Sequence, residues 1–574
     1  MKRSKFILLL IFLLGFGLRF YQIDSYGLYF DEKVTVLVSQ AISPEGANQV
    51  DVFSKPYFTP NDFWKQKTLA DFYVAVARGD WGNSPMHYLF LNLWIKVFGI
   101  SDFAVRMSSL FWSLLLIPLI YFFVLRNFKD QILAILCAFL ACIEPFFIAQ
   151  SHIVRNYSMS LFLTLLATFL FFEIIKRDTS QYHSNKNTLY FWYSVSATAC
   201  LSSHYLTFPV FVAHGFIFLF TAKEITVWKK MIFALVLPII SLSYWLVAGG
   251  GKYSLKTMQD VGAFYKNIAL HPPNPNPYIG LIDKVSINAV LYKLLPVLAD
   301  LFLLTNSLTT SLIGSKNLII AVCVSVFICF CFYRFLKSNL NIYLSFILGI
   351  SCLQYFVYSA NPLSFIQLSL VGVLVFLYFR YHKFQKVDYY LALMIVVSIV
   401  LMMLQVVLAG HTFSINQRYL AFVFPFSIIL IAKIIWFNWR FSKYTKFIVL
   451  ALLPLFLKNI YIVNQDIYDD QNPKYTYFAQ KRETNPHAKA AQLAQKNYQT
   501  GDTLILPNIN RGTFADVGYT QASKSVFDSQ LINLYLCETS LIIQKVNIIN
   551  STLLILKKKE AKSDTLFDFK GLIY

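Results

Sequence analysis

Runs of about 20 apolar residues recur along most of this chain, and they leave few folds open to it. A helix that crosses a bilayer needs about 20 predominantly apolar residues, and by that measure the sequence predicts about 13 membrane spans. We therefore predict an α-helical polytopic membrane protein. The predicted spans lie near residues 5–20, 104–125, 131–149, 157–175, 188–203, 205–222, 230–248, 316–335, 339–359, 363–380, 388–409, 418–437 and 445–463.

The distribution of Lys and Arg agrees with a chain that crosses a membrane many times. The net charge is +21, which in a soluble protein would suggest a nucleic-acid partner. Here Lys and Arg gather in alternate short loops, among them RNFKD, KEITVWKK, RYHKFQK and RFSKYTK, whereas the opposite short loops hold only Arg155 and Arg418. This is the positive-inside pattern, and it places the N-terminus in the cytoplasm. The charge therefore reports topology, and no nucleic-acid partner is expected.

Three longer stretches lie on the non-cytoplasmic side. We predict a membrane module over residues 1–463, with a first outer loop at 21–103 and a second at 249–315. Residues 464–574 change character, with one helical pattern and short β-type runs such as DTLILPN, and predict a small α/β outer domain. Near the end of the first loop, apolar residues at helical spacing predict an interfacial helix lying on the membrane: Leu89, Leu93, Trp94 and Val97.

Several common chemistries have no support in the sequence. There is no GxxxxGK[ST], H-E-x-x-H or G-x-S-x-G motif. Of the eight Cys, seven lie in apolar runs and only Cys537 lies outside them, so neither a disulfide framework nor a zinc site is predicted. ATP-driven transport and the usual hydrolase mechanisms are thereby disfavoured.

Two adjacent carboxylates, Asp31 and Glu32, follow the first span in the stretch YFDEKVT. The sequence places them at the start of a helix, where a carboxylate is stabilised by free N–H groups, and one of the two is expected to have that capping role. The alternative is catalysis. Glycosyl transfer with inversion needs a carboxylate that takes the proton from an acceptor hydroxyl.

A second acid of the first loop, Asp80, lies in RGDWGNSPMHY, where it precedes a tight turn and then a helix. It can complete a pair with Asp31 across the loop. By turn propensity alone, an Asx-turn before Gly82 is the commoner use of such an Asp.

Basic residues against the positive-inside trend invite an anionic ligand. Arg155 and Arg418 have a fork of donors that suits a phosphate at the membrane edge. The alternative for each is an Arg at the membrane boundary whose donors meet backbone carbonyls. Lys252, in GGGKYSLK of the second outer loop, can face the same site.

Four blocks of sequence, in order, resemble one family. LRFYQIDSYGLYFDEKVT resembles the first-loop signature of the GT-C glycosyltransferases of the family 39-like superfamily, which includes protein O-mannosyltransferases and bacterial lipid A aminoarabinose transferases. DWGNSPMHYLFLNLWIKVFG is similar to its next block, SHIVRNYS to its Arg-x-Tyr segment, and QRYLAFVFPF to its late Arg-Tyr segment. The chain departs from the family at Asn83, where a His-Pro-Pro-Leu turn would begin, and at His152-Ile153, where Gln-Glu is common.

The resemblance implies a GT-C fold and a polyprenyl-phosphate-linked sugar as donor. It implies that Asp31, with Glu32 and Asp80, is catalytic, and that Arg155, Arg418, Tyr419 and Lys252 bind the donor phosphate. Since the imidazole expected at position 83 is missing, no metal site is predicted, and a divalent cation stays an open alternative. The acceptor is a lipid, a glycan or a protein hydroxyl, and the sequence does not choose among them.

Two other functions stay open at this stage. A lipid-linked sugar flippase would need ionisable residues along its spans, and acids there are sparse. A polysaccharide polymerase or ligase shares the lipid-linked donor but would concentrate its basic residues in a late loop. The early acid-bearing loop favours the transferase, which we expect in the plasma (inner) membrane with its site on the periplasmic or extracellular side.

Overall fold

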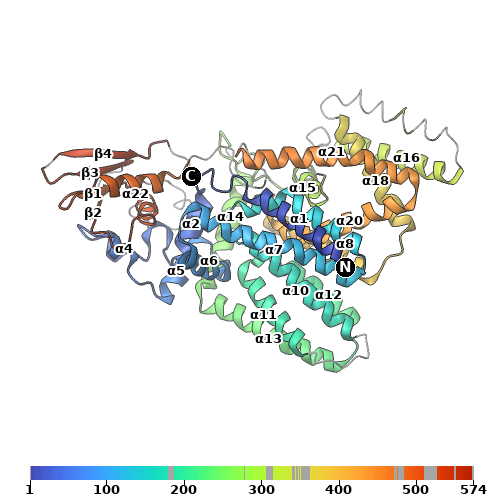
Figure 1. Ribbon diagram of the computed structural model, residues 1–574, viewed down its shortest axis with the longest axis horizontal. Helices are drawn as coiled ribbons and strands as arrows, with labels where there is room; N and C mark the ends of the chain where they lie inside the picture. The colour runs from blue at the N-terminus through green and yellow to red at the C-terminus, as the bar shows by residue number, and fades with distance from the viewer. Residues whose placement is uncertain are drawn as a thin grey trace.

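The computed structural model describes a mostly helical, elongated molecule (Figure 1). The strands and α22 lie at one end of it, α16 and α18 lie at the other, and the first outer loop adjoins the strands. The described residues are 2–178, 187–276, 278–304, 315–338, 362–470, 484–509, 526–547, 551–560 and 562–571, with isolated residues 343, 347, 349, 350 and 475.

Every predicted span except 339–359, which lies largely outside the described residues, coincides with a helix or with a bent pair of helices. The bounds in the membrane module are α1 Lys2–Phe20, α7 Asp102–Phe128, α8 Gln131–Ile143, α9 Pro145–Ser151, α10 Tyr157–Asp178, α11 Asn187–Ser203, η2 Tyr205–Thr207, α12 Phe208–Thr221, α13 Ile225–Val247, α16 Ser315–Ser338, α18 Pro362–Tyr381, α19 Lys386–Ala409, η5 Gln417–Val423, α20 Phe424–Phe441 and α21 Lys443–Tyr468.

Fewer helices are long and apolar enough to cross a membrane than the 13 spans predicted. Among the described helices, six are long and apolar enough to cross a membrane, and α8 with α9, bent by 53°, can make a seventh. The six are α7, α10, α13, α19, η5 with α20, and α21. Helix α1 is outside this set because its 19 residues include the cations Lys2, Arg3, Lys5 and Arg19. The predicted count is therefore not confirmed.

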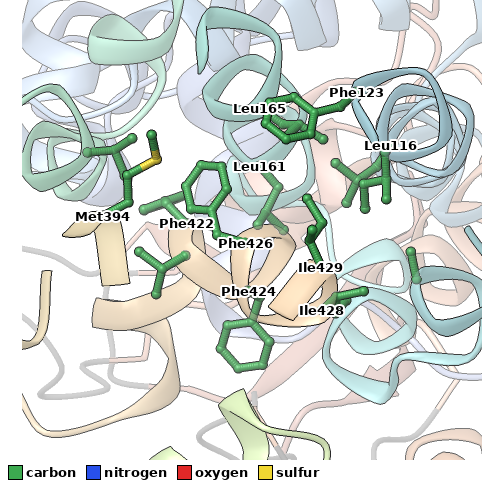
Figure 2. Packing of buried hydrophobic residues seen from close by; sticks show 14 of the residues in the cluster. Leu116, Phe123, Leu161, Leu165, Met394, Phe422, Phe424, Phe426, Ile428 and Ile429 are labelled. Carbon is green, nitrogen blue, oxygen red and sulfur yellow. The ribbon is translucent and has the colours of Figure 1, made fainter. Parts of the chain in front are cut away.

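The core of the membrane module is built around η5 and α20. Figure 2 shows Phe422 and Phe426 among side chains of α7, α10 and α19, whereas Phe424 points away from them. The ring of Phe424 stacks on that of Phe146 with centroids 4.4 Å apart. Because interiors are close-packed, this cluster fixes where η5, and with it Arg418, sits against α10.

The first outer loop folds into short helices with strong sequence caps. Thr59 with Asp62 and Thr68 with Asp71 form capping boxes, in which each side chain satisfies a free N–H of the first turn. The bounds in the two outer loops are α2 Phe30–Ser39, η1 Pro44–Gly46, α3 Val50–Phe53, α4 Pro60–Trp64, α5 Leu69–Gly79, α6 Pro85–Phe98, η3 Gly250–Tyr253, α14 Ser254–Leu270 and α15 Ile287–Leu301.

Helix α6 covers the predicted interfacial segment. Leu91 and Ile95 are buried, whereas Leu89, Leu93 and Val97, spaced four residues apart, are exposed. An exposed apolar stripe on one face is what a helix lying in the membrane interface requires. The interfacial position of α6 stays a prediction, which this stripe supports.

Residues after α21 form a small sheet with two helices. The strand order is β2-β1-β3-β4, with β1 and β2 parallel and the other pairs antiparallel. Helix α22 and strands β1, β2 and β3 lie where the sequence patterns predict a helix and strands. Helix α21 continues past the predicted boundary at 463, and the sequence patterns do not predict α23 or β4. The bounds are α22 Pro486–Asn497, β1 Thr503–Leu506, α23 Phe527–Asn533, β2 Gln544–Val546, β3 Leu553–Lys557 and β4 Ser563–Asp568.

Candidate active site

Asp31 and Glu32 are adjacent in α2, but one side chain is partly exposed and the other is buried. Asp31 lies in the first turn with 30% of its side chain exposed, and one of its oxygens is 3.9 Å from Nη1 of Arg418. The Glu32 side chain is fully buried and accepts a hydrogen bond from the backbone N–H of Tyr29, at 3.1 Å, as the capping half of the pair. Of these two acids, only Asp31 is therefore partly open to solvent.

Arg106 of α7 holds Glu32 in place. Its guanidinium donates to both oxygens of Glu32, at 3.0 Å each, and the backbone N–H of Val154 donates to the same carboxylate at 2.9 Å. The guanidinium also donates to the carbonyls of Ile23, Tyr26 and Gly27, which precede α2. A bidentate, fully buried pair of this kind fixes geometry, and here it fixes the start of α2.

Asp80 lies at the C-terminal end of α5 and forms a salt bridge with Arg155. One oxygen of Asp80 is 3.3 Å from Nη2 of Arg155, and both side chains are 14% exposed. Nη1 of Arg155 donates to the hydroxyl of Thr35 at 3.1 Å, and that hydroxyl donates to the Asp31 carbonyl. The structure thus brings together the acids Asp31 and Asp80 with Arg155.

The turn after Asp80 is held by contacts from α13, the second outer loop and η2. Trp245 donates through Nε1 to the carbonyl of Gly82 at 2.7 Å, and Ser254 donates to the carbonyl of Trp81. Asn83 accepts a hydrogen bond from the backbone N–H of Tyr205 at 3.1 Å. Asp80 is therefore set by tertiary contacts rather than by a solvated Asx-turn.

Arg418 closes the other side of the cluster. It lies in η5, 5.7 Å from the ring of Tyr157 at the start of α10, and that ring is 5.2 Å from the ring of His204. Tyr419 is half-buried beside Arg418 and packs against the main apolar core. Lys252 is exposed in η3, the segment whose backbone packs on the turn after Asp80.

Electrostatic interactions link the side chains of Asp31, Asp80, Arg155, Arg418 and His204. Burial works against the charge of Arg155, but Asp80, Tyr88 and Asp31 outweigh it and raise the pKa of Arg155 above its usual value. Burial lowers the pKa of His204 to about 3, and Arg155 and Arg418 contribute to the shift. The site is a cluster of two acids and two Arg, with neutral imidazole beside it.

Two imidazoles were missed by the sequence analysis. His204 accepts a hydrogen bond at Nδ1 from the backbone N–H of Leu206, at 3.1 Å, so its neutral ring carries the proton on Nε2. His87, one helical turn after Asn83, is buried, and neither ring nitrogen has a hydrogen-bond partner in the described part of the chain. Burial, with a contribution from Arg155, lowers its pKa to about 3. The departure from the family pattern at Asn83 was the one signal that could have directed attention to His87.

A resident metal ion does not fit this cluster as it stands. Over the described residues, no group of three or more His, Cys, Asp or Glu side chains could hold one.

One family model matches a part of the chain that carries Asp80 and Arg155 of this cluster. Residues 69–249 match the model described as "Dolichyl-phosphate-mannose-protein mannosyltransferase". The resemblance to the protein O-mannosyltransferase family is confirmed over this segment. The segment includes Asp80, Arg155 and His204, whereas Asp31 and Arg418 lie outside it. No curated protein sequence matches the chain.

The chain is similar to solved structures at low sequence identity and low TM-score. ArnT from Cupriavidus metallidurans, bound to undecaprenyl phosphate, is 11% identical, with 93% of this chain and 89% of that one covered and a TM-score of 0.38. The Archaeoglobus fulgidus oligosaccharyltransferase AglB, in complex with an inhibitory peptide and a dolichol-phosphate, is 12% identical, with 87% and 58% covered and a TM-score of 0.40. Since these scores are low, nothing about this chain is inferred from them.

Proposed function

We propose that this protein is a multi-pass membrane glycosyltransferase that moves a sugar from a polyprenyl-phosphate-linked donor to an acceptor on the non-cytoplasmic face. The observation that carries the proposal is the pairing of Asp31 with Arg418 and of Asp80 with Arg155 at one site. Acids beside Arg, at the outer end of membrane helices, suit a reaction that needs both a base and a bound phosphate.

Arg155 and Arg418 are the proposed phosphate ligands. Nε of Arg155 is buried and has no hydrogen-bond partner among the residues described, so it has a donor left for a ligand. A guanidinium matches the oxygens of a phosphate through parallel N–H donors. Neutralising the phosphate makes it a better leaving group. Tyr419 and Lys252 are proposed as further ligands at the edge of the same site.

Asp31 is the proposed general base. It removes the proton from the acceptor hydroxyl as that oxygen forms its bond to the anomeric carbon, and the bond from that carbon to the donor phosphate oxygen breaks on the opposite face. The sugar is thereby inverted, the proton is on Asp31, and polyprenyl phosphate leaves. When donor phosphate binds Arg418, that Arg is drawn from Asp31, whose carboxylate then meets the acceptor.

Asp80 is the proposed second acid of the site, which positions Arg155, and Glu32 is reassigned from catalysis to holding α2. The acceptor is a lipid, glycan or protein group whose oxygen can reach Asp31. The bilayer holds the donor tail. The proposed side of the reaction is the periplasmic or extracellular side of the plasma (inner) membrane, and the positive-inside pattern supports a non-cytoplasmic site.

A comparison of two conservative variants tests the proposal. Cells expressing wild type, Asp31→Asn or Asp24→Asn at equal membrane abundance are compared by mass spectrometry of envelope glycolipids, glycans and glycoproteins. Asp24 is an exposed acid of the same loop and serves as the control. We expect one sugar mass that is present with wild type and Asp24→Asn and lost with Asp31→Asn. A product undiminished by Asp31→Asn would contradict its role as base, and the absence of any sugar difference between wild type and cells without the protein would contradict the transferase.

A further inference from the structure

An apolar cavity of about 680 Å³ lies among α8, α18, α19, α20 and α21, and Phe302, Leu303 and Leu304 beyond α15 also line it. It separates the main core from a second apolar cluster of α16, α18 and α21, and it has lining residues from both. Its size is in the range of pockets that hold small molecules. An apolar space left empty would lose contacts on every wall, so a hydrocarbon occupant stabilises it.

The cavity opens toward the bilayer. Phe379, Tyr389 and Val396 line it, yet they are 63%, 62% and 53% exposed. In a membrane, side chains exposed on these helices face lipid. A hydrocarbon chain can therefore enter sideways without crossing water.

Polar residues lie at only one end of the cavity. Tyr378 and Asp388 line it there, and the carboxylate of Asp388 is already paired with Lys433. The hydroxyl of Tyr378 is buried and has no hydrogen-bond partner in the described ranges of the chain. This end thus offers an unused hydroxyl to the polar part of an amphiphile.

Three exposed cations surround the same end. Arg380, Lys383 and Lys386 alternate along the α18–α19 connection with the cavity-lining residues Phe379 and Phe384. None of the three cations is in a salt bridge with another described residue. The positive-inside bias accounts for their side of the membrane but not for this alternation. Basic pockets between helices on the cytoplasmic side are suited to anionic lipid headgroups.

We propose that this cavity binds an anionic phospholipid of the cytoplasmic leaflet, with its acyl chain between α8, α18, α19, α20 and α21 and its phosphate at Arg380, Lys383 and Lys386. The site is distinct from that of the donor. Helix α19 has 24 residues, so Lys386 is about 36 Å along the helix from the end that leads to Arg418. One phosphate cannot occupy both positions.

Native mass spectrometry of the delipidated full-length protein tests this assignment. The probes are phosphatidylglycerol and phosphatidylcholine with identical acyl chains. For wild type we expect about tenfold higher occupancy by phosphatidylglycerol. Ala392→Phe, which fills the cavity, should abolish that binding, whereas Leu404→Phe, on an exposed position of the same helix outside the cavity, should retain it.

A second set of variants, at exposed positions, tests the lipid site even if Ala392→Phe does not fold. The triple change Arg380→Ala, Lys383→Ala and Lys386→Ala should reduce phosphatidylglycerol to the level of phosphatidylcholine. The control removes three other exposed cations predicted on the same face: Lys5, Lys223 and Lys229. Equal binding of the two lipids by wild type, or unchanged binding by Ala392→Phe, would overturn the proposal. Undecaprenyl phosphate displacing phosphatidylglycerol from the Ala392→Phe-sensitive site would assign the cavity to the donor instead.

Discussion

Adjacent residues in one helical turn can have unrelated roles, and Asp31 and Glu32 show why. A helix turns by about 100° per residue, so the second carboxylate points into the protein when the first points out. Burial then decides their chemistry, because a buried carboxylate must be fully hydrogen-bonded, as Glu32 is, and cannot also meet a substrate.

Substitution of Glu32 should therefore lower stability, whereas substitution of Asp31 should lower the rate of transfer. Glu32→Ala leaves the Arg106 cation buried without its partner, and we expect a loss of about 3–5 kcal/mol in stability. Asp31→Asn should change stability by no more than about 0.5 kcal/mol and reduce turnover by about 10²–10⁴-fold. Thermal unfolding in detergent and transfer assays on both variants separate the two effects. Full stability together with lost transfer in Glu32→Ala would return Glu32 to the catalytic group.

Two buried imidazoles, those of His87 and His204, make the stability of the folded protein depend on pH. His87 and His204 stay neutral down to a pH of about 3 in the folded protein, whereas in the unfolded chain they take up protons below about 6.5. Between these values the unfolded state binds more protons, so stability is present above pH 6.5 and falls as the pH falls. Each ring can contribute up to about 1.4 kcal/mol per pH unit.

Thermal unfolding from pH 7 to pH 4 measures this dependence. His87→Leu should flatten the decline relative to wild type, and His271→Asn, at an exposed loop position, should leave it unchanged. An equally steep decline in His87→Leu would show that its ring takes up its proton in the folded state.

At the scale of the element, the turn after Asp80 depends on one glycine. Gly82 has φ +73°, and a Cβ there would lie 2.3 Å from Oγ of Ser254 and 2.7 Å from the carbonyl oxygen of Gly250. The turn carries Asp80, and through it the position of Arg155. Gly410 also has positive φ, +76°, but its nearest contact would be an ordinary 3.6 Å.

The pair Gly82→Ala and Gly410→Ala separates backbone strain from close packing. Both variants have the cost of an L-residue at positive φ, about 1–2 kcal/mol. Only Gly82→Ala must also displace the second outer loop, so we expect it to reduce transfer at least tenfold more than Gly410→Ala does. Transfer rates and melting temperatures of purified protein provide the comparison. Equal losses in the two variants would mean that packing against residues 250–254 does not set Asp80.

The sequence predicts helices better than it predicts what they bring together. Apolar runs and capping residues locate α7, α19 and α21 because those signals are local. The pairing of Glu32 with Arg106 joins residues 74 positions apart, and its partners are set by packing that no local pattern encodes. Likewise, His87 looks like an ordinary interfacial residue until α6 is placed against the loop of Arg155. Loop position and charge placement made Asp31, Asp80, Arg155 and Arg418 candidates, and the resemblance implied their roles. The structure supplies the pairing of Asp31 with Arg418 and of Asp80 with Arg155.

At the scale of the whole molecule, the residues after α21 are built into the first outer loop. Gln530 of α23 donates to the carbonyl of Ser43 and to the side chain of Gln49, at 3.0 and 2.8 Å. Tyr535 donates to Asp102 at the start of α7. The isolated bridge between Phe58 and Gln544 joins the loop to the sheet. These contacts make the outer layer one packed unit, in which the C-terminal segment supports the loop that carries the acids.

Phe527 is the side chain that tests this support most directly. It is 4% exposed, and its ring is 5.5 Å from that of Phe30, the residue before Asp31. Phe527→Ala should cost about 3–5 kcal/mol and lower transfer as well, because α2 loses the surface against which its first turn packs. Leu541→Ala, at an 84% exposed position of the same segment, should change neither. A Phe527→Ala protein that is destabilised but transfers at the wild-type rate below its melting temperature would show that the C-terminal segment stabilises the outer layer without positioning Asp31, and the base would then depend on Arg106 and Glu32 alone for its place.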